Sequence, residues 1–410
     1  MAGIGAGRIC SHLRAEKVAG LRLAPEFSLL CLAARPAAEE NTGELSRAIA
    51  AISDWDAVIE GAQRNRVTAL VLAGLRTSEL QIPSEVIDEL HRRTVTSAAR
   101  SLSQIKDLED LSAAFSNAGI RFFVIKGIAL SLQLYGDPAR RAADDIDLLV
   151  APDQFLQAHD VLLRSGYRCE NGPPSQAPRE VYRHWVKDIS YAHERSLIRV
   201  ELHHRLNRNP YLLEWPFDEL WNDRVELRVG QAKVATLPSE KLALYLCAHG
   251  ANHGWERLRW LVDFAAVARK LGNFDELLEE ASRVGLRAAM LQALQLAHER
   301  LGMPLAAQYI EQANKSSRVK WLNFCLRHFL GGSSWRRRPR EKTWAWQWRY
   351  SLWLFVYKLS LKTEWRYRRY QCATMWIHPP DWGVVRLPAA LFWMYPLLRP
   401  FTWAKRRLQR

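Results

Sequence analysis

The stretch "KGIALSLQLYGDPARRAADDIDLLV", residues 126–150, contains the most informative pattern of the chain. It ends with Asp145 and Asp147, one residue apart among aliphatic residues. Alternate residues of a strand point to the same face, so the two carboxylates should project together while Ile146 and Leu148 enter a core. Neighbouring carboxylates repel one another unless a cation lies between them, and oxygen ligands suit Mg²⁺ or Mn²⁺. The pattern favours a metal site, with a solvated strand end as the alternative.

The residues before the aspartates predict a turn that suits phosphate. "IRFFVIKG" (120–127) is a short β-branched and aromatic run, typical of a buried strand that ends at Gly127, and "IALSLQLYG" then has a helical pattern. The start of a helix offers free backbone N–H groups and a positive dipole end, which suits a triphosphate. Lys126 is predicted to contact phosphate, or else its side chain points elsewhere.

A third carboxylate follows in "IRVELHH" (198–204), where Glu201 is flanked by aliphatic residues. If this segment pairs beside "DIDLLV", Glu201 joins the two aspartates, and three carboxylates can hold two divalent ions. By the alternation of a strand, His203 shares the face of Glu201 and is predicted to lie near the metals.

In their order and spacing, these motifs resemble the polymerase-β-type nucleotidyltransferase superfamily. The similarity is closest to its bacterial "nucleotidyltransferase family protein" group and extends over roughly residues 45–310. The resemblance implies an α+β fold, with a small mixed sheet and helices as its core. It also implies that Asp145, Asp147 and Glu201 are the catalytic and metal-binding residues, with Gly127 at the nucleotide-binding turn.

The turn departs from the superfamily pattern, because a Gly-Ser or Gly-Gly pair is expected where this chain has Lys126 and Gly127. A lysine would replace a hydroxyl–phosphate contact with a charge–phosphate contact. Arg141 matches the group's Arg-x-x-x-Asp-x-Asp spacing, and a guanidinium suits phosphate geometry. We therefore predict that Arg141 binds the nucleotide, with a solvated turn charge as the alternative, and interpret Asp144 as a turn residue.

Further polar residues are candidate substrate contacts. His249 and His253 lie one helical turn apart in "HGANH", but the glutamate of the H-E-x-x-H zinc motif is missing. They are predicted to be polar-face histidines or substrate contacts, and His203 is a third candidate. Arg259 is either another contact or the partner of Asp263 in a helix ion pair.

The chain is predicted to have four regions. A helical region (1–118) precedes an α/β nucleotidyltransferase core (119–236), which is followed by a helical domain (237–330) and a basic, tryptophan-rich helical tail (331–410). The expected fold class is thus α+β, a nucleotidyltransferase core flanked by helical regions.

The tail carries almost all of the net charge of +15, since residues 331–410 contain 17 Lys and Arg, 3 Asp and Glu and 10 of the 17 tryptophans. Interleaved basic and aromatic residues can bind nucleic acid, lie on an anionic membrane surface, or form helices that pack on the body or on a partner. Nucleic acid is the least favoured of the three.

The remaining composition indicates a cytoplasmic protein. The six cysteines are scattered without a C-x-x-C pair, which is typical of a reducing compartment. The start has no signal-peptide pattern, and no apolar run approaches the roughly 18–20 residues of a membrane span. The alternative location is the inner face of a membrane, reached through the tail.

The predicted reaction is Mg²⁺-dependent. A hydroxyl of an acceptor attacks the α-phosphorus of a nucleoside triphosphate such as ATP, and pyrophosphate leaves. A small molecule, a sugar or a peptide is expected as the acceptor. The alternative is a non-catalytic protein of the same fold that docks to a membrane or a partner enzyme through the basic tail.

Overall fold

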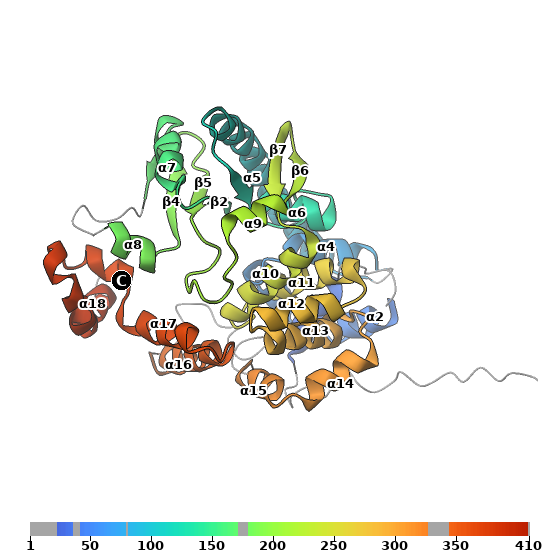
Figure 1. The fold of residues 1–410 in the computed structure, drawn as a ribbon. Helices are drawn as coiled ribbons and strands as arrows, with labels where there is room; N and C mark the ends of the chain where they lie inside the picture. The colour runs from blue at the N-terminus through green and yellow to red at the C-terminus, as the bar shows by residue number, and fades with distance from the viewer. Residues whose placement is uncertain (1–22, 36–41, 79–80, 171–178, 327–343, 409–410) are drawn as a thin grey trace, which may run out of the picture.

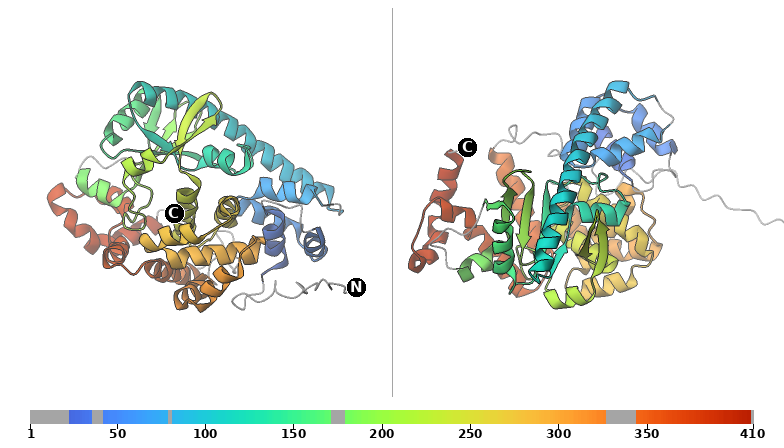
Figure 2. Two further views of the ribbon diagram at one scale, coloured as in Figure 1. Left: turned by 45° about the vertical axis from the view of Figure 1, so that its right-hand side comes forward. Right: turned by 90° about the horizontal axis from the view of Figure 1, so that it is seen from above.

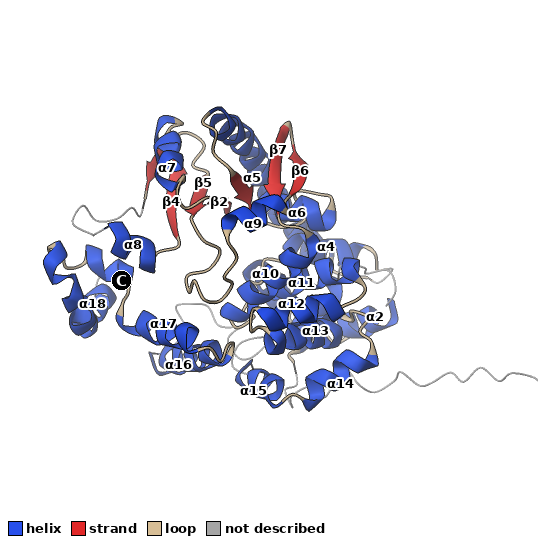
Figure 3. Ribbon diagram, viewed as in Figure 1, coloured by secondary structure: helices blue, strands red, loops and turns tan. Residues whose placement is uncertain are grey.

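The computed structural model describes residues 23–35, 42–78, 81–170, 179–326 and 344–408. They form a seven-stranded mixed sheet with helices before and after it in the sequence (Figure 1), so the predicted α+β class is confirmed. Figure 3 shows that the strands gather in one part of the molecule, whereas helices make up most of the rest.

Helices precede the sheet, as the apolar spacing predicts. Asp54 caps one of them by accepting a hydrogen bond from the backbone N–H of Ala57 at 2.9 Å. Gly119 adopts a φ of +66° directly after the longest helix and ends it. The helices are α1 (Pro25–Ala33), α2 (Thr42–Ala50), α3 (Trp55–Arg64), α4 (Thr68–Arg76) and α5 (Ser84–Asn117).

The sheet has the strand order β3-β4-β5-β2-β1-β7-β6. The pairs β2–β5 and β1–β7 are parallel and the other pairs are antiparallel. The sequence patterns do not identify β3, β6 and β7, which are short. The strands are β1 (Phe122–Val124), β2 (Asp145–Val150), β3 (Tyr167–Cys169), β4 (Asp188–His193), β5 (Arg199–His203), β6 (Val225–Val229) and β7 (Ala232–Thr236).

Two apolar cores lie on opposite faces of the sheet. Ile146 and Leu148 of β2 enter the core formed with α5, while Leu149 enters the core shared with the helices that follow the sheet. This alternation is the one predicted for "DIDLLV". It places Asp145 and Asp147 on the face of Leu149.

More helices lie between and after the strands, and those after the sheet form a compact group with α1 (Figure 1). The first set consists of α6 (Gly127–Tyr135), α7 (Phe155–Arg164), α8 (Arg179–Trp185) and α9 (Phe217–Asn222). The second consists of α10 (Ser239–Asn252), α11 (Leu258–Leu271), α12 (Asp275–Arg283), α13 (Arg287–Leu301), α14 (Ala307–Lys315) and α15 (Ser317–Leu326).

The described part of the tail is helical and packs back on the body. It runs beside α15 and reaches α8, as the views in Figures 1 and 2 show. Its helices are α16 (Trp344–Ser360), α17 (Trp365–Trp376), α18 (Tyr395–Leu408) and the 3₁₀ segments η3 (Pro379–Gly383) and η4 (Ala389–Met394). The first residues of the predicted tail, up to residue 343, lie outside the described residues.

Polar contacts join this tail to α8 and to the helices that follow the sheet. The hydroxyl of Tyr370 donates to the carbonyl oxygen of His184 at 2.6 Å, and Tyr357 donates to Gln292 of α13 at 2.7 Å. Of the three interpretations of the tail, packing on the body is therefore observed. None of the helices in the described ranges has the length and apolar composition needed to cross a membrane.

Candidate functional site

The pairing of three strands brings acidic residues together. In the parallel pair β2–β5, Asp147 lies opposite Glu201, as predicted for adjacent strands. The antiparallel pair β4–β5 places Asp188 opposite His203. Because the sheet fixes this register, four side chains from three separate segments meet at one place.

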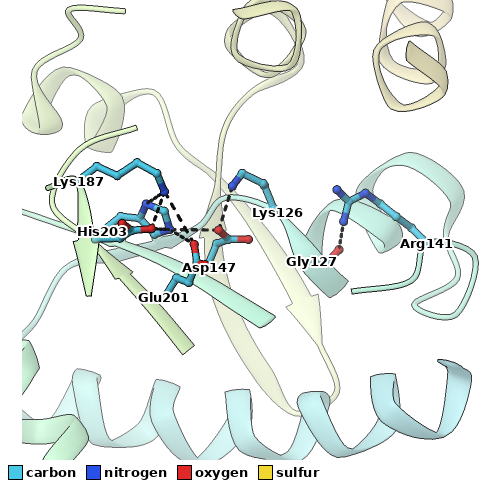
Figure 4. A network of polar contacts seen from close by, with 8 residues as sticks. Lys126, Gly127, Arg141, Asp147, Lys187, Glu201 and His203 are labelled. Carbon is cyan, nitrogen blue, oxygen red and sulfur yellow. Dashed lines mark hydrogen bonds and ion pairs between the residues drawn. The ribbon is translucent and has the colours of Figure 1, made fainter. Parts of the chain in front are cut away.

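Asp147, Glu201 and His203 form the closest group, with ligand atoms all within 4.8 Å of one another. His203 Nε2 lies 3.1 Å from Asp147 Oδ1 and 3.3 Å from Glu201 Oε2 (Figure 4). Two carboxylates and an imidazole can bind a divalent cation, and a histidine in the set suits Mn²⁺ at least as well as Mg²⁺. His203, expected only near the metals, is thus among the candidate ligands.

Asp145 lies outside this closest group, although it was predicted as a ligand. It is half-buried at the start of β2, on the same face as Asp147. Burial raises the pKa of Asp145 to about 6, with further contributions from the negative charges of Asp147 and Glu201. A cation bound beside these acids would relieve that repulsion.

Lys126 extends to the acids rather than away from them. Its Nζ lies 2.9 Å from Asp147 Oδ1. Burial by itself would raise the pKa of Asp147, but Lys126 and His203 hold it well below its usual value. The residue that departs from the superfamily pattern is therefore a built-in counter-ion of the central carboxylate.

Lys187 and Asp188 belong to the same network, and the sequence patterns did not single them out. Lys187 Nζ lies 2.6 Å from Asp188 Oδ2 and 3.8 Å from Glu201 Oε2. Burial would raise the pKa of Asp188, but His203 and Lys187 lower it to about 2. Asp188 opens "DISYAHE", a predicted strand, yet only the register of β4 with β5 reveals its place beside His203.

Gly127 begins α6 directly after β1, as predicted for the turn. Its φ of +62° is a conformation that residues with a side chain rarely adopt. A Cβ atom at this position would lie 3.2 Å from the backbone oxygen of Asp145. Both the conformation and the close approach of the strand therefore favour glycine.

Arg141 differs from the prediction of a phosphate clamp. Only 4% of the residue is exposed, and its Nε donates to Asp263 Oδ2 at 2.8 Å. Its Nη1 donates to the carbonyl oxygen of Gly127 at 3.4 Å (Figure 4). The guanidinium therefore forms hydrogen bonds inside the protein, and these link α11 to the Gly127 turn.

Arg259 also forms a hydrogen bond within the protein. Its Nη1 donates to the carbonyl oxygen of Ala142 at 2.6 Å, and burial lowers the pKa of Arg259 to about 9. The ion pair of Asp263 is formed with Arg141 and not with Arg259, so the helix pair considered from the sequence is not the one observed. Both arginines hold the segment before β2 against α11.

His249 and His253 lie together on α10, with ring centroids 4.8 Å apart. Burial lowers the pKa of both imidazoles, that of His253 to about 3. Nearby cations lower these pKa values further, chiefly Lys126 for His249 and Lys358 of α16 for His253. Lys126 and Lys358 therefore lie near the two histidines on the α10 side of the site.

The comparisons with known proteins identify one family. The model of a family described as uncharacterised nucleotidyltransferase matches residues 52–302, which include every candidate residue from Lys126 to Arg259. Neither a curated protein nor a solved structure matches the chain. Since the match covers more than half of the sequence, this chain belongs to the family of uncharacterised nucleotidyltransferases.

Proposed function

We propose that this protein transfers a nucleotidyl group from a nucleoside triphosphate, such as ATP, to a hydroxyl of an acceptor and releases pyrophosphate. We also propose that the family is a bacterial branch of the polymerase-β-type superfamily and that the activity requires Mg²⁺ or Mn²⁺. The observation that carries the proposal is the group of Asp147, Glu201 and His203 on neighbouring strands, beside the Gly127 turn.

The chain's own carboxylates suit this chemistry. The acceptor oxygen forms a bond to the α-phosphorus, the bond from that phosphorus to the pyrophosphate oxygen breaks, and the hydroxyl proton goes to a base. Asp145 and Glu201, both half-buried, provide carboxylates that can accept this proton. Asp147, Glu201 and His203 would hold the cation, with Asp145 beside them. When bound, a divalent cation would neutralise phosphate charge and make the hydroxyl more acidic.

Cations around the site suit a triphosphate. Lys126 and Lys187 already lie within 4 Å of the acids, and Lys358 lies close enough to His253 to lower its pKa. The free N–H groups at the start of α6 add a further site for phosphate oxygens. Arg141, which contacts the Gly127 carbonyl, is assigned the positioning of this turn instead of direct contact with phosphate.

The acceptor is proposed to be a small molecule, a sugar or a peptide, bound near His203, His249 and His253. Arg259 would support this region through its contact with the Ala142 carbonyl. We further propose that the chain is divided into the four regions predicted from the sequence and that the protein is located in the cytoplasm.

The test is calorimetric titration of ATP and of GTP into the full chain, with and without Mg²⁺. Asp147→Asn and Glu201→Gln should abolish the Mg²⁺-dependent part of the binding. Asp153→Asn, which changes an exposed acid just after β2, should bind like the wild type. Transfer of radiolabel from an α-labelled triphosphate to cell-extract molecules would then identify the acceptor. Equal Mg²⁺-dependent binding by the wild type and Asp147→Asn would contradict the proposal.

A non-catalytic nucleotidyltransferase-fold protein is the second candidate. It is supported by the pairing of Asp147 with Lys126 and of Glu201 with Lys187, since built-in cations make a metal less necessary. Such a protein would bind triphosphate equally well with and without Mg²⁺, and it would transfer no label.

A further inference from the structure

Helix α18 turns polar side chains toward η3, a preceding 3₁₀ segment of the tail. Asp381 of η3 is 1% exposed and accepts a hydrogen bond from Arg399 Nη1 at 3.0 Å. Arg406 Nη2 lies 2.9 Å from the same carboxylate, and Thr402 is fully buried. Apart from Tyr395 at its start, the inward face of α18 thus depends on charge pairing. A surface helix normally buries its apolar stripe instead.

The outward side of α18 is apolar. Leu397 is 64% exposed and Phe401, one helical turn later, is 73% exposed. Pro400 and Ala404 are also exposed, and Trp393 of η4, four residues before Leu397, is 67% exposed. We call these five residues the α18 apolar face. A contiguous exposed apolar strip is uncommon on monomeric proteins and marks a contact surface.

The surroundings of the α18 apolar face are cationic. Between residues 365 and 408 the sequence contains a single acid, Asp381, which is buried under its arginines. Lys405 continues the exposed side of α18, and Arg386 is exposed just before η4. Further exposed cations lie on α17, namely Arg366, Arg368 and Arg369. Residues 365–408 therefore combine exposed apolar side chains with positive charge, and the exposed acid nearest in sequence is Glu364, which precedes α17 and pairs with Lys362.

We propose that the α18 apolar face inserts into the interfacial layer of an anionic lipid bilayer, while the surrounding cations contact lipid phosphates. Interfacial helices lie in the membrane plane with apolar side chains inward and Lys or Arg at the headgroups, and tryptophan favours this depth. A second copy of the chain would bring two positive surfaces together, and nucleic acid would leave the apolar side chains in water. An anionic bilayer would bury the apolar side chains and also bind the surrounding cations.

The surface contains none of the candidate site residues. Residues 365–408 lie beyond the matched residues 52–302, so membrane binding is expected with or without nucleotide. Loss of one function therefore does not imply loss of the other.

The test is flotation of the full chain with vesicles. Wild type should float with mixed phosphatidylcholine–phosphatidylglycerol vesicles and stay unbound with pure phosphatidylcholine, because both charge and apolar insertion are needed. Leu397→Ser/Phe401→Ser should reduce the partition coefficient at least about tenfold. Lys405→Gln should reduce it by about fivefold.

The matched control is Val95→Ser/Leu102→Ser on α5, whose side chains are 52% and 66% exposed. It should float like the wild type. Circular dichroism and the melting temperature should confirm that both double variants fold. Three results would overturn the proposal: no flotation of the wild type, equal flotation of the two double variants, or a wild-type oligomer that Leu397→Ser/Phe401→Ser converts to monomers.

Discussion

The ammonium of Lys126 lies against the carboxylate that we assign to the metal site. Its Nζ is 2.9 Å from Asp147 Oδ1, and its side chain is 15% exposed. A divalent cation and Lys126 would thus share one acid. A phosphate group arriving with the cation would offer the ammonium a second partner.

Lys126→Met should separate the role of Lys126 as the partner of Asp147 from its proposed role as a phosphate contact. Removal of the competing ammonium should strengthen Mg²⁺ binding in the absence of nucleotide, because Asp147 loses its partner. Triphosphate affinity should fall by about tenfold, the free energy of one charge-assisted hydrogen bond. Calorimetry with Mg²⁺ alone and with Mg²⁺-ATP measures both. A parallel loss of both affinities would show instead that Lys126 supports the fold of the site.

A second residue of interest lies far from the site. Glu299 of α13 accepts a hydrogen bond from Gln295 at 3.0 Å through Oε1, while its buried Oε2 has no hydrogen-bond partner among the described residues. Burial raises the pKa of Glu299 to about 7 from an ordinary value of 4.5. The folded protein therefore holds this proton more tightly than the unfolded chain does.

Stability should consequently depend on pH through Glu299. The stability that the folded protein gains from its tighter hold on the Glu299 proton is fully present below pH 4.5. It is lost as the pH rises through about 7. Glu299→Gln should remove this dependence and stabilise the protein near pH 8 by up to about 3 kcal/mol relative to the wild type. Urea unfolding across this range measures the difference. Glu311→Gln, at an exposed position of α14, is the control. If the free energy of unfolding depended on pH identically in the two variants, Glu299 would not be the source of the dependence.

At the scale of elements, α18 depends on one buried carboxylate. Asp381 pairs with both Arg399 and Arg406, which lie two turns apart on the same side of the helix. With these partners α18 can keep Leu397 and Phe401 exposed and still remain docked.

Asp381→Asn should loosen α18 from η3. Removal of the shared carboxylate breaks the ion pairs that two partly buried guanidinium groups make with Asp381, at a cost of about 3 kcal/mol or more. Hydrogen exchange should show loss of protection confined to α18 and η3. Glu364→Gln, which changes a carboxylate that is 48% exposed, should have little effect. Unchanged protection of α18 in Asp381→Asn would argue against this role of the ion pairs.

At the scale of the whole molecule, the tail shares a core with the body. Tyr357, Leu361 and Tyr367 belong to the apolar cluster that includes α1 and the helices after the sheet. An element that contributes fully buried residues to a common core should unfold together with it.

Leu361→Ala should therefore destabilise the entire chain by about 2–5 kcal/mol, since Leu361 is fully buried. Urea unfolding, followed by circular dichroism and tryptophan fluorescence, should still give one transition. Leu352→Ala on α16, at a residue that is 45% exposed, should change stability by less than about 0.5 kcal/mol. Two separate transitions, with the body unchanged, would show that the tail folds independently.

Much of the fold was readable from the sequence because its signals are local. The period of two in "DIDLLV" predicts which side of β2 carries the acids, and Gly127 and Asp54 follow from backbone geometry and capping. The α+β class and the pairing of the strands of Asp147 and Glu201 are likewise confirmed. The roles of these residues in catalysis, and the division into four regions, stay predictions.

Only the tertiary structure decided which charges meet. Lys126 turns to Asp147, Asp188 joins from β4, and Arg141 goes to Asp263, because strand register and helix packing bring together residues far apart in the chain. The tail's composition likewise left three interpretations open, and only the structure shows that the tail packs on the body. A local pattern fixes the face on which a side chain lies, whereas its partner depends on contacts between distant segments.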